Sequence, residues 1–220
     1  NRSFAIIYQI IPFIQLRYQQ TAKNVSVTII LCCMNGKLWN NETPKGARGR
    51  IDMEKKWNVG IVGATGMVGQ RLITLLNDHP YFQITALMAS ARSAGRSYEK
   101  SVEGRWKMQT PLPQNVAQMP VYDAQDLASW SDQVDFVFCA VNMPKDQTRQ
   151  MEEQYAKNEI PVVSCNSAFR RTPDVPMVIP EINSDHFAVI EAQRKRLGTR
   201  RGFIAVKPNC SIQANVPMLS

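Results

Sequence analysis

Two stretches of this sequence contain residue types that could do chemistry: a glycine-rich turn after residue 62 and a cysteine at position 210. In "KPNCSIQANVP", Cys210 follows an apolar run and precedes a short helix-like run. Backbone amides at a helix start lower the pKa of a thiol and can stabilise an oxyanion. Cys210 is therefore either a nucleophile or an ordinary buried thiol, and its neighbours alone leave both interpretations open.

The glycine-rich stretch "GATGMVG" joins a predicted buried strand to a predicted helix, and Gly63, Gly66 and Gly69 are spaced three apart in it. Glycines at such positions permit a tight turn and let the backbone approach a pyrophosphate at the helix N-terminus. The pattern is a relative of the dinucleotide fingerprint, and a plain strand-to-helix turn is the alternative. Its place at the start of a βαβ unit favours dinucleotide binding.

The end of the second predicted strand, "MASARSAG", indicates which dinucleotide binds. An NAD-selective site usually places Asp or Glu here to bond the ribose 2′-hydroxyl, and this stretch has neither. It offers Ser90, Arg92 and Ser93 instead, and arginine pairs bidentately with phosphate. The sequence therefore predicts NADP, and the alternative is that Arg92 is a solvated loop residue.

The charge distribution gives no reason to expect nucleic acid as a partner. The net charge is +8, but residues 1–52 carry seven Lys/Arg against two Asp/Glu, and residues 53–220 carry nineteen against sixteen. Most of the excess thus lies in the first quarter of the chain, and no long basic run follows it.

Cysteine usage and hydropathy argue against metal sites, disulfides and membrane spans. The five cysteines are odd in number and show neither a CxxC pattern nor a Cys/His pair at ligand spacing. No apolar run reaches the roughly 18 residues of a membrane span. We therefore expect a cytoplasmic protein with reduced thiols, no metal and no membrane partner.

The order of predicted elements defines the fold class. Buried strands are expected over 58–64, 82–90, 134–141, 160–167 and 202–207, and helices over 67–80, 124–130, 145–159 and 184–198. Residues 97–120 are expected to be irregular. Strands that alternate with helices predict an α/β fold, a Rossmann-like doubly wound parallel sheet.

The domain boundaries follow from changes in this pattern. Residues 1–52 show no helical or strand period, and Met53 begins a stretch typical of a protein N-terminus. We expect 1–52 to be an extension outside the fold and 53–209 to be an NADP-binding domain. Residues 210–220 would then start a truncated second α+β domain for substrate binding and dimerisation.

Four segments together resemble aspartate-semialdehyde dehydrogenase: "GIVGATGMVGQRL", "SARSAG", "CNSAFRRTPDVPMVIPEIN" and "KPNCSIQANVPML". They occur in that family's order, and the resemblance covers about residues 57–220. It implies reduction of 4-aspartyl phosphate to aspartate 4-semialdehyde by NADPH, with release of phosphate. This step belongs to lysine, threonine and methionine synthesis.

The same resemblance implies roles for individual residues. Cys210 matches the nucleophile that forms an acyl thioester, and Arg170 matches the arginine that holds the substrate phosphate or inorganic phosphate. Arg92 and Ser93 match contacts to the adenosine phosphate. The cofactor-phosphate turn is matched by four consecutive residues, Thr65, Gly66, Met67 and Val68.

The resemblance also bears on what the chain can do by itself. The family's general base is a histidine of the substrate domain, which would lie beyond Ser220, and neither His79 nor His186 matches it. We therefore expect the 220-residue chain to be inactive alone and the full-length protein to be a homo-oligomer.

Two alternatives stay open at this point. N-acetyl-glutamyl-phosphate reductase uses the same chemistry, but its cysteine typically lies in a Gly-Cys-Tyr-like setting, whereas Cys210 lies between Asn209 and Ser211. The other alternative is a non-catalytic NADP-binding module with Cys210 merely buried.

Overall fold

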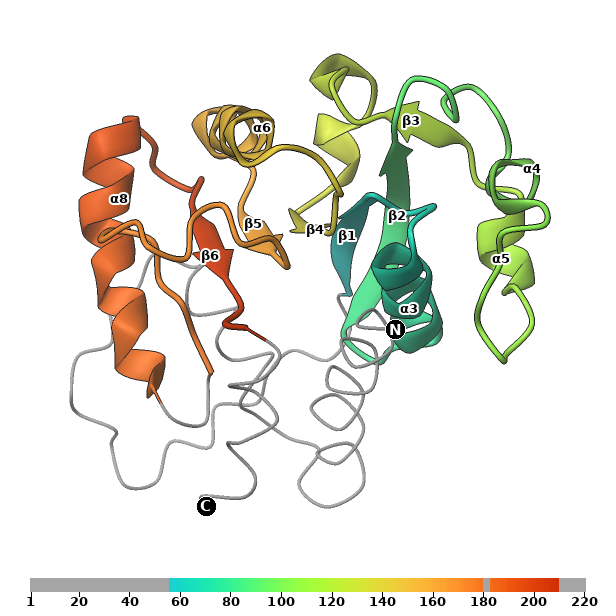
Figure 1. Ribbon diagram of the computed structural model, residues 1–220, viewed down its shortest axis with the longest axis horizontal. Coiled ribbons are helices and arrows are strands. Elements are labelled where there is room, and N and C mark those ends of the chain that lie inside the picture. Colours follow the sequence, from blue (N-terminus) through green and yellow to red (C-terminus); the bar gives the residue numbers. More distant parts are fainter. Residues whose placement is uncertain (1–55, 180–182, 210–220) are drawn as a thin grey trace.

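A computed structural model describes residues 56–179 and 183–209 of the chain, and these form one six-stranded sheet (Figure 1). The strand order is β3-β2-β1-β4-β5-β6, and every neighbouring pair is parallel. The strands are β1 (Trp57–Val62), β2 (Phe82–Ala89), β3 (Val121–Asp123), β4 (Phe136–Cys139), β5 (Val162–Ser164) and β6 (Ile204–Val206). The order reverses direction between β1 and β4, which confirms the predicted Rossmann-like doubly wound sheet.

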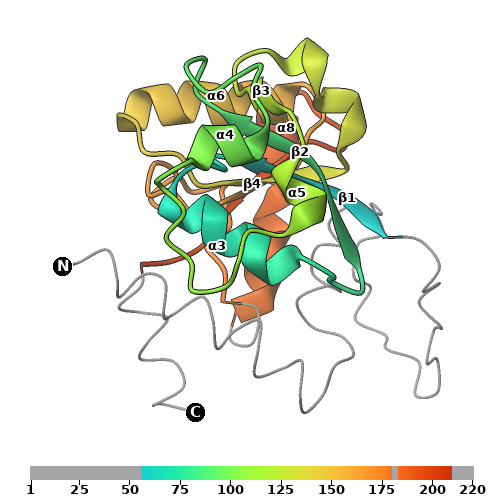
Figure 2. The ribbon, with the colours of Figure 1, turned by 90° about the vertical axis from the view of Figure 1, so that its right-hand side faces the viewer.

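Helices occupy the connections between the strands. They are α3 (Met67–Leu76), α4 (Tyr98–Val102), α5 (Gln114–Ala117), α6 (Lys145–Lys157) and α8 (Ile190–Leu197), with 3₁₀ turns η1 (Leu127–Ser129), η2 (Ser131–Gln133) and η3 (Ser184–Val189). Figures 1 and 2 show α4 and α5 at one end of the sheet and α8 at the other. Within the described residues, no helix is both long and apolar enough to cross a membrane.

Two hydrophobic cores lie on the two faces of the sheet. On one face, Ile61 of β1 packs in a cluster with Leu72 and Ile73 of α3. On the other face, Val62 lies in a cluster with Tyr155 of α6. Successive residues of a strand point to opposite faces, so one buried strand feeds both cores. Full burial of a Val, Ile or Leu side chain stabilises the folded state by about 1.5–3 kcal/mol relative to leaving that side chain exposed.

The outer edge of β6 is paired with a glutamine side chain at Ile204 and with the backbone of residues 176–178 at Val206. Gln193 of α8 is fully buried; its Nε2 donates to Ile204 O at 3.0 Å and to Asp174 O at 2.8 Å, and its Oε1 accepts from Ile204 N at 2.6 Å. The side-chain amide thus replaces a neighbouring strand at this point. Unpaired strand groups would otherwise be buried at a cost.

The segment between β2 and β4 differs from the prediction. Residues 97–120 are not irregular throughout but contain α4 and α5, and β3 follows as a strand that was not predicted. The segment 124–130 is not an α-helix but contains only the 3₁₀ turn η1. These elements are three to five residues long, which is too short to show a hydrophobic period in the sequence. Tertiary contacts, such as the bridge between Ser97 and Pro120, stabilise them instead.

Three predictions fall outside the described residues: the extension over 1–52, the start of a second domain at 210–220, and the presentation of Cys210 at a helix start.

Candidate functional site

The glycine-rich turn between β1 and α3 packs backbone against backbone. Gly63 has a φ of 83°, and a Cβ there would lie 2.5 Å from Ala140 O, just after β4. A Cβ at Gly69 would lie 2.3 Å from Gly63 O. Both contacts are too short for any side chain. Only glycine therefore lets α3 begin this close to the end of the sheet.

Gly66 has a different role in the same turn. It is the N-cap of α3, and a Cβ there would meet only Gly63 O, at 3.3 Å. Protein packing therefore excludes a side chain at Gly66 less strictly than at Gly69. Gly66 provides no side chain to cap the first turn of α3, so its free amides and the positive end of the helix dipole are left for an anion.

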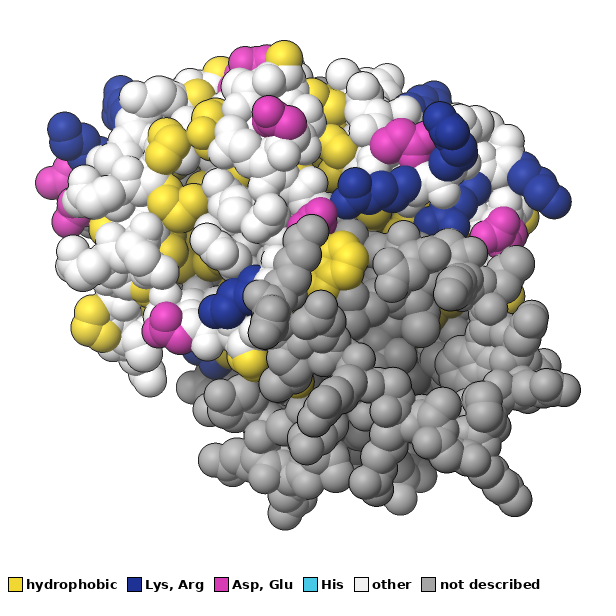
Figure 3. Space-filling view, turned by 180° about the vertical axis from the view of Figure 1, so that it is seen from behind, with side chains coloured by type: hydrophobic (Ala, Val, Ile, Leu, Met, Phe, Trp, Pro, Cys, Tyr) yellow, Lys and Arg dark blue, Asp and Glu magenta, His cyan; other side chains and the backbone are white. Residues whose placement is uncertain are grey.

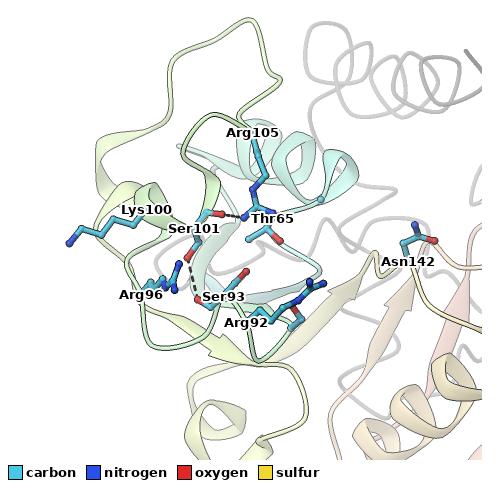
Figure 4. Close-up of a pocket in the computed structure, with 10 residues that line it drawn as sticks. Thr65, Arg92, Ser93, Arg96, Lys100, Ser101, Arg105 and Asn142 are labelled. Atoms are coloured by element: carbon cyan, nitrogen blue, oxygen red, sulfur yellow. Dashed lines mark hydrogen bonds between the residues drawn. The ribbon is translucent and has the colours of Figure 1, made fainter.

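A cavity of about 580 Å³ opens beside this turn (Figure 4). It is lined by the loops that follow β1, β2 and β4 and by the segment around α4; the lining residues are Thr65, Gly66, Ser90, Arg92, Ser93, Arg96, Lys100, Ser101, Arg105 and Asn142. The cavity therefore lies at the carboxyl ends of the strands, where the strand order reverses. Open α/β sheets bind their ligands at this place.

The lining of the cavity is strongly basic. Four of its residues are Arg or Lys, and none of those that the structure describes there is acidic. In the described part of the chain, no carboxylate forms a salt bridge with these four cations. Cations and hydroxyls without acidic partners suit a ligand with several phosphate groups.

The structure brings five of the predicted cofactor residues together. Thr65 and Gly66 line the cavity from the turn, and Ser90, Arg92 and Ser93 line it from the loop after β2. Met67 and Val68 begin α3 next to Gly66 but do not line the cavity. For these two residues the contribution to phosphate binding would come from the backbone.

Five further lining residues were not found from the sequence: Arg96, Lys100, Ser101, Arg105 and Asn142. Lys100, Ser101 and Arg105 lie on the segment 97–120 that was expected to be irregular, and Arg96 directly precedes it. This segment folds back over the turn. Its buried Tyr98 donates a hydrogen bond to Ala64 O at 2.7 Å, and burial raises the pKa of this phenol, which keeps it a donor. The series of Arg and Lys residues between positions 92 and 105 is the feature of the sequence that could have found them.

Arg170 also lies near the carboxyl ends of the strands, but beside β5 and β6 and outside the cavity. Its Nε donates to Lys207 O at 3.1 Å and its Nη2 to Cys165 O at 3.4 Å. Arg170 thus joins the segments that follow β5 and β6, and it does not line the cavity. Lys207 lies three residues before Cys210, which is outside the described residues. The role of Arg170 in holding the substrate phosphate stays a prediction.

A buried polar cluster lies between β4, β5 and α6. Glu152 is fully buried, and its Oε1 accepts hydrogen bonds from Ser164 Oγ at 2.6 Å and from Asn166 Nδ2 at 2.8 Å. Burial raises the pKa of Glu152 despite these bonds. Burial, and then the neighbouring Glu152, also raise the pKa of Cys139. Its thiol therefore stays protonated, as expected for a structural cysteine.

The two histidines have structural environments. His79 stacks on Phe82 with ring centroids 4.7 Å apart, and burial, with a smaller effect of Lys56, lowers its pKa to about 4. His186 contacts the backbone of Met177 through Nδ1. Neither lines the cavity. The residues that the structure describes contain no cluster of three metal-ligating side chains.

Comparisons with known proteins agree with this geometry. The family model described as "Semialdehyde dehydrogenase, NAD binding domain" matches residues 58–190. The aspartate-semialdehyde dehydrogenase of Methanothermobacter thermautotrophicus is 45% identical over 154 residues, which are 70% of this chain and 42% of that protein. That of Schizosaccharomyces pombe is 43% identical over 158 residues, 72% of this chain and 43% of that protein.

Solved structures give the same result. The crystal structure of aspartate semialdehyde dehydrogenase with NADP from Candida albicans is 35% identical, with a TM-score of 0.66, over 75% of this chain and 46% of that one. The corresponding enzyme II from Vibrio cholerae, complexed with ASA, is 26% identical, with a TM-score of 0.56, over the same 75% and 46%.

The chain spans less than half the length of the curated relatives it matches. The family model covers residues 58–190, which include the cavity and the strands up to β5. The predicted resemblance is confirmed by both kinds of comparison. The chain belongs to the semialdehyde dehydrogenase family, and the part that matches is the family's NAD-binding domain.

Proposed function

We propose that this chain is the NADP-binding part of an aspartate-semialdehyde dehydrogenase. The observation that carries the proposal is the acid-free, cation-lined cavity at the carboxyl ends of β1, β2 and β4. The identity of 45% with an aspartate-semialdehyde dehydrogenase supports the aspartyl enzyme over the N-acetyl-glutamyl-phosphate reductase. It also argues against a non-catalytic module.

The residues that would hold the cofactor divide into two groups. The backbone of Thr65 and Gly66, with the N-terminus of α3, would hold the pyrophosphate. Arg92 and Ser93, at the end of β2 where NAD-selective sites carry an acid, would hold the 2′-phosphate. The bound cofactor supplies a hydride for the reduction.

The acyl chemistry follows from the assignment of Cys210 as the nucleophile. Its thiolate would attack the acyl carbon of 4-aspartyl phosphate, the C–O bond to phosphate would break, and a thioester would form. A thioester carbonyl accepts hydride readily, and collapse of the resulting tetrahedral species would return the thiolate and release the aldehyde. Arg170 would hold the phosphate group next to this carbon.

The setting of the proposed enzyme follows from its family. The substrates are small molecules, and we propose a cytoplasmic enzyme that forms homo-oligomers when full length. The domain organisation, with residues 53–209 as the NADP-binding domain, belongs to the same proposal. We also propose that the general base lies on the part of the family fold that this chain does not span.

The test is substitution of the nucleophile in the full-length enzyme. Cys210→Ala should abolish phosphate-dependent NADPH formation from aspartate semialdehyde, because no thioester can form, and should leave the affinity for NADP unchanged. Cys139→Ala is the matched control, since this buried thiol takes no part, and it should retain turnover. Substantial turnover by Cys210→Ala would refute the assignment.

A further inference from the structure

One buried side chain connects the phosphate turn to the basic segment opposite it. Gln70 is the fourth residue of α3 and is only 2% exposed. Its Nε2 donates to Thr65 O at 3.1 Å and to Arg105 O at 2.9 Å, and its Oε1 accepts from Lys107 N at 2.8 Å. Both N–H donors of the side-chain amide and one lone pair of its oxygen therefore bond to backbone groups. These groups belong to the phosphate turn and to residues 105–107.

These hydrogen bonds act on an exposed turn between two packed side chains, Val102 and Trp106. The backbone N–H of Arg105 donates to Val102 O at 2.8 Å, and its guanidinium donates to Ser101 O. The residues around it, 103–105, are exposed. Buried hydrogen bonds restrict motion more than exposed ones do. The amide of Gln70 is thus a buried side-chain hydrogen-bond partner for the backbone of Arg105 itself.

The position of Arg105 relative to the turn suggests which phosphate it serves. Figure 4 shows Arg105 and Thr65 beside each other in the cavity, whereas Arg92 comes from the loop after β2. The turn and the start of α3 form the pyrophosphate site in folds of this class. A cation held beside Thr65 would therefore meet the part of the cofactor that NAD and NADP share.

We propose that Gln70 is a positioning residue that holds Arg105 beside the phosphate turn, so that Arg105 binds the cofactor's pyrophosphate. This inference rests on the proposed function. It assigns different phosphates to two cations of the cavity: Arg105 to the pyrophosphate and Arg92 to the 2′-phosphate. A cationic side chain whose backbone is already fixed loses less conformational entropy when the ligand binds. The hydrogen bonds from Gln70 should therefore increase the affinity of Arg105 for the pyrophosphate.

Gln193 provides a matched control because it makes the same kind of contacts far from the cavity. It too is fully buried, and its amide makes three hydrogen bonds to backbone groups, at the edge of β6. Replacement of either glutamine by methionine keeps the side-chain length and removes all three bonds. Both variants should lose stability, and only the one at position 70 should also lose cofactor affinity.

The experiment is a titration of NADP and NAD into the unsubstituted chain and into Gln70→Met, Arg105→Ala, the double variant and Gln193→Met, with thermal unfolding of each. Arg105→Ala and Gln70→Met should each weaken both cofactors roughly tenfold. The double variant should be no weaker than either single variant, because Gln70 acts through Arg105. Gln193→Met should unfold at lower temperature and retain its affinities.

Three results would overturn the inference: native affinities in Gln70→Met, losses that multiply in the double variant, or a loss confined to NADP. Absence of NADP binding by the unsubstituted chain would instead overturn the proposed function, and with it the inference. If Gln70→Met does not fold, Gln70→Glu keeps the acceptor for Lys107 N and loses both donors. Its affinities for NADP and NAD should then fall together, and unchanged affinities would contradict the proposal.

Discussion

Basic side chains gather at both ends of the sheet, but their partners differ. Around α4, the residues Arg92, Arg96, Lys100 and Arg105 line a cavity that has no acidic lining residue among those described. Around α8, Arg194 pairs with Glu191, Arg196 with Glu153 and Asp174, and Arg201 with Asp135. Figure 3 shows basic and acidic side chains next to one another at this second end.

The difference shows how to tell a binding site from a solvated surface. Surface ion pairs contribute little to stability and neutralise each other's field. Cations without acidic partners repel one another. A cavity lined by several of them is stable only if this repulsion is small or if an anionic ligand relieves it. The cavity at the α4 end is therefore the candidate ligand site, and the charges at the α8 end need no ligand to explain them.

The largest expected effect comes from two glycines, one in each region. A Cβ at Gly69 would lie 2.3 Å from Gly63 O, and a Cβ at Gly202 would lie 1.8 Å from Ala156 O. Gly69→Ala and Gly202→Ala should each lower the free energy of unfolding by about 3 kcal/mol, because backbone must move. Urea unfolding measures this.

The two glycine variants should differ in cofactor binding. Gly69→Ala moves the phosphate turn and should lose NADP affinity, whereas Gly202→Ala should bind NADP as tightly as the unsubstituted chain in its folded fraction. Equal losses of NADP affinity in both variants would show that the two regions are not independent.

A pair of arginines gives the next largest effect. Arg92→Ala should weaken NADP binding by about 1–3 kcal/mol through lost charged hydrogen bonds, and weaken NAD binding much less. Arg196→Ala removes exposed ion pairs with Asp174 and Glu153. It should cost less than about 1 kcal/mol of stability and leave cofactor affinity unchanged. If Arg92→Ala weakens NADP and NAD equally, Arg92 does not contact the 2′-phosphate.

The site could be predicted from the sequence only where local pattern determines it. The strands β1, β2 and β4 were placed because each is a buried apolar run, and the glycine spacing located the phosphate turn. Arg92 was found because the absence of an acid after β2 is visible in the sequence. Arg96 and Arg105 were missed because their place in the cavity depends on contacts between residues distant in sequence. These contacts join Gln70 to Arg105, Tyr98 to Ala64 and Ser97 to Pro120.

The smallest effect concerns pH and lies away from the cavity. The pKa of His79 is lowered to about 4 from an ordinary value of 6.5 by burial and Lys56. Between these values the unfolded chain binds more protons than the folded one, so stability is complete above pH 6.5 and is lost as the pH falls toward 4.

His79→Phe should remove this part of the pH dependence while it keeps a ring against Phe82. The measurement is the free energy of unfolding at pH 7 and pH 5 for both proteins. Affinity for NADP should not change in the variant, because His79 precedes β2 at the opposite end from the cavity. An unchanged pH dependence would mean that His79 is not the group responsible.

The central claim is that the cavity beside the glycine-rich turn binds NADP in preference to NAD. Its most direct test is an equilibrium titration of the chain with each cofactor at one fixed salt concentration. The account predicts binding of both, with NADP at least roughly tenfold tighter because Arg92 and Ser93 meet a 2′-phosphate that NAD lacks. Equal affinities, or tighter binding of NAD, would contradict it.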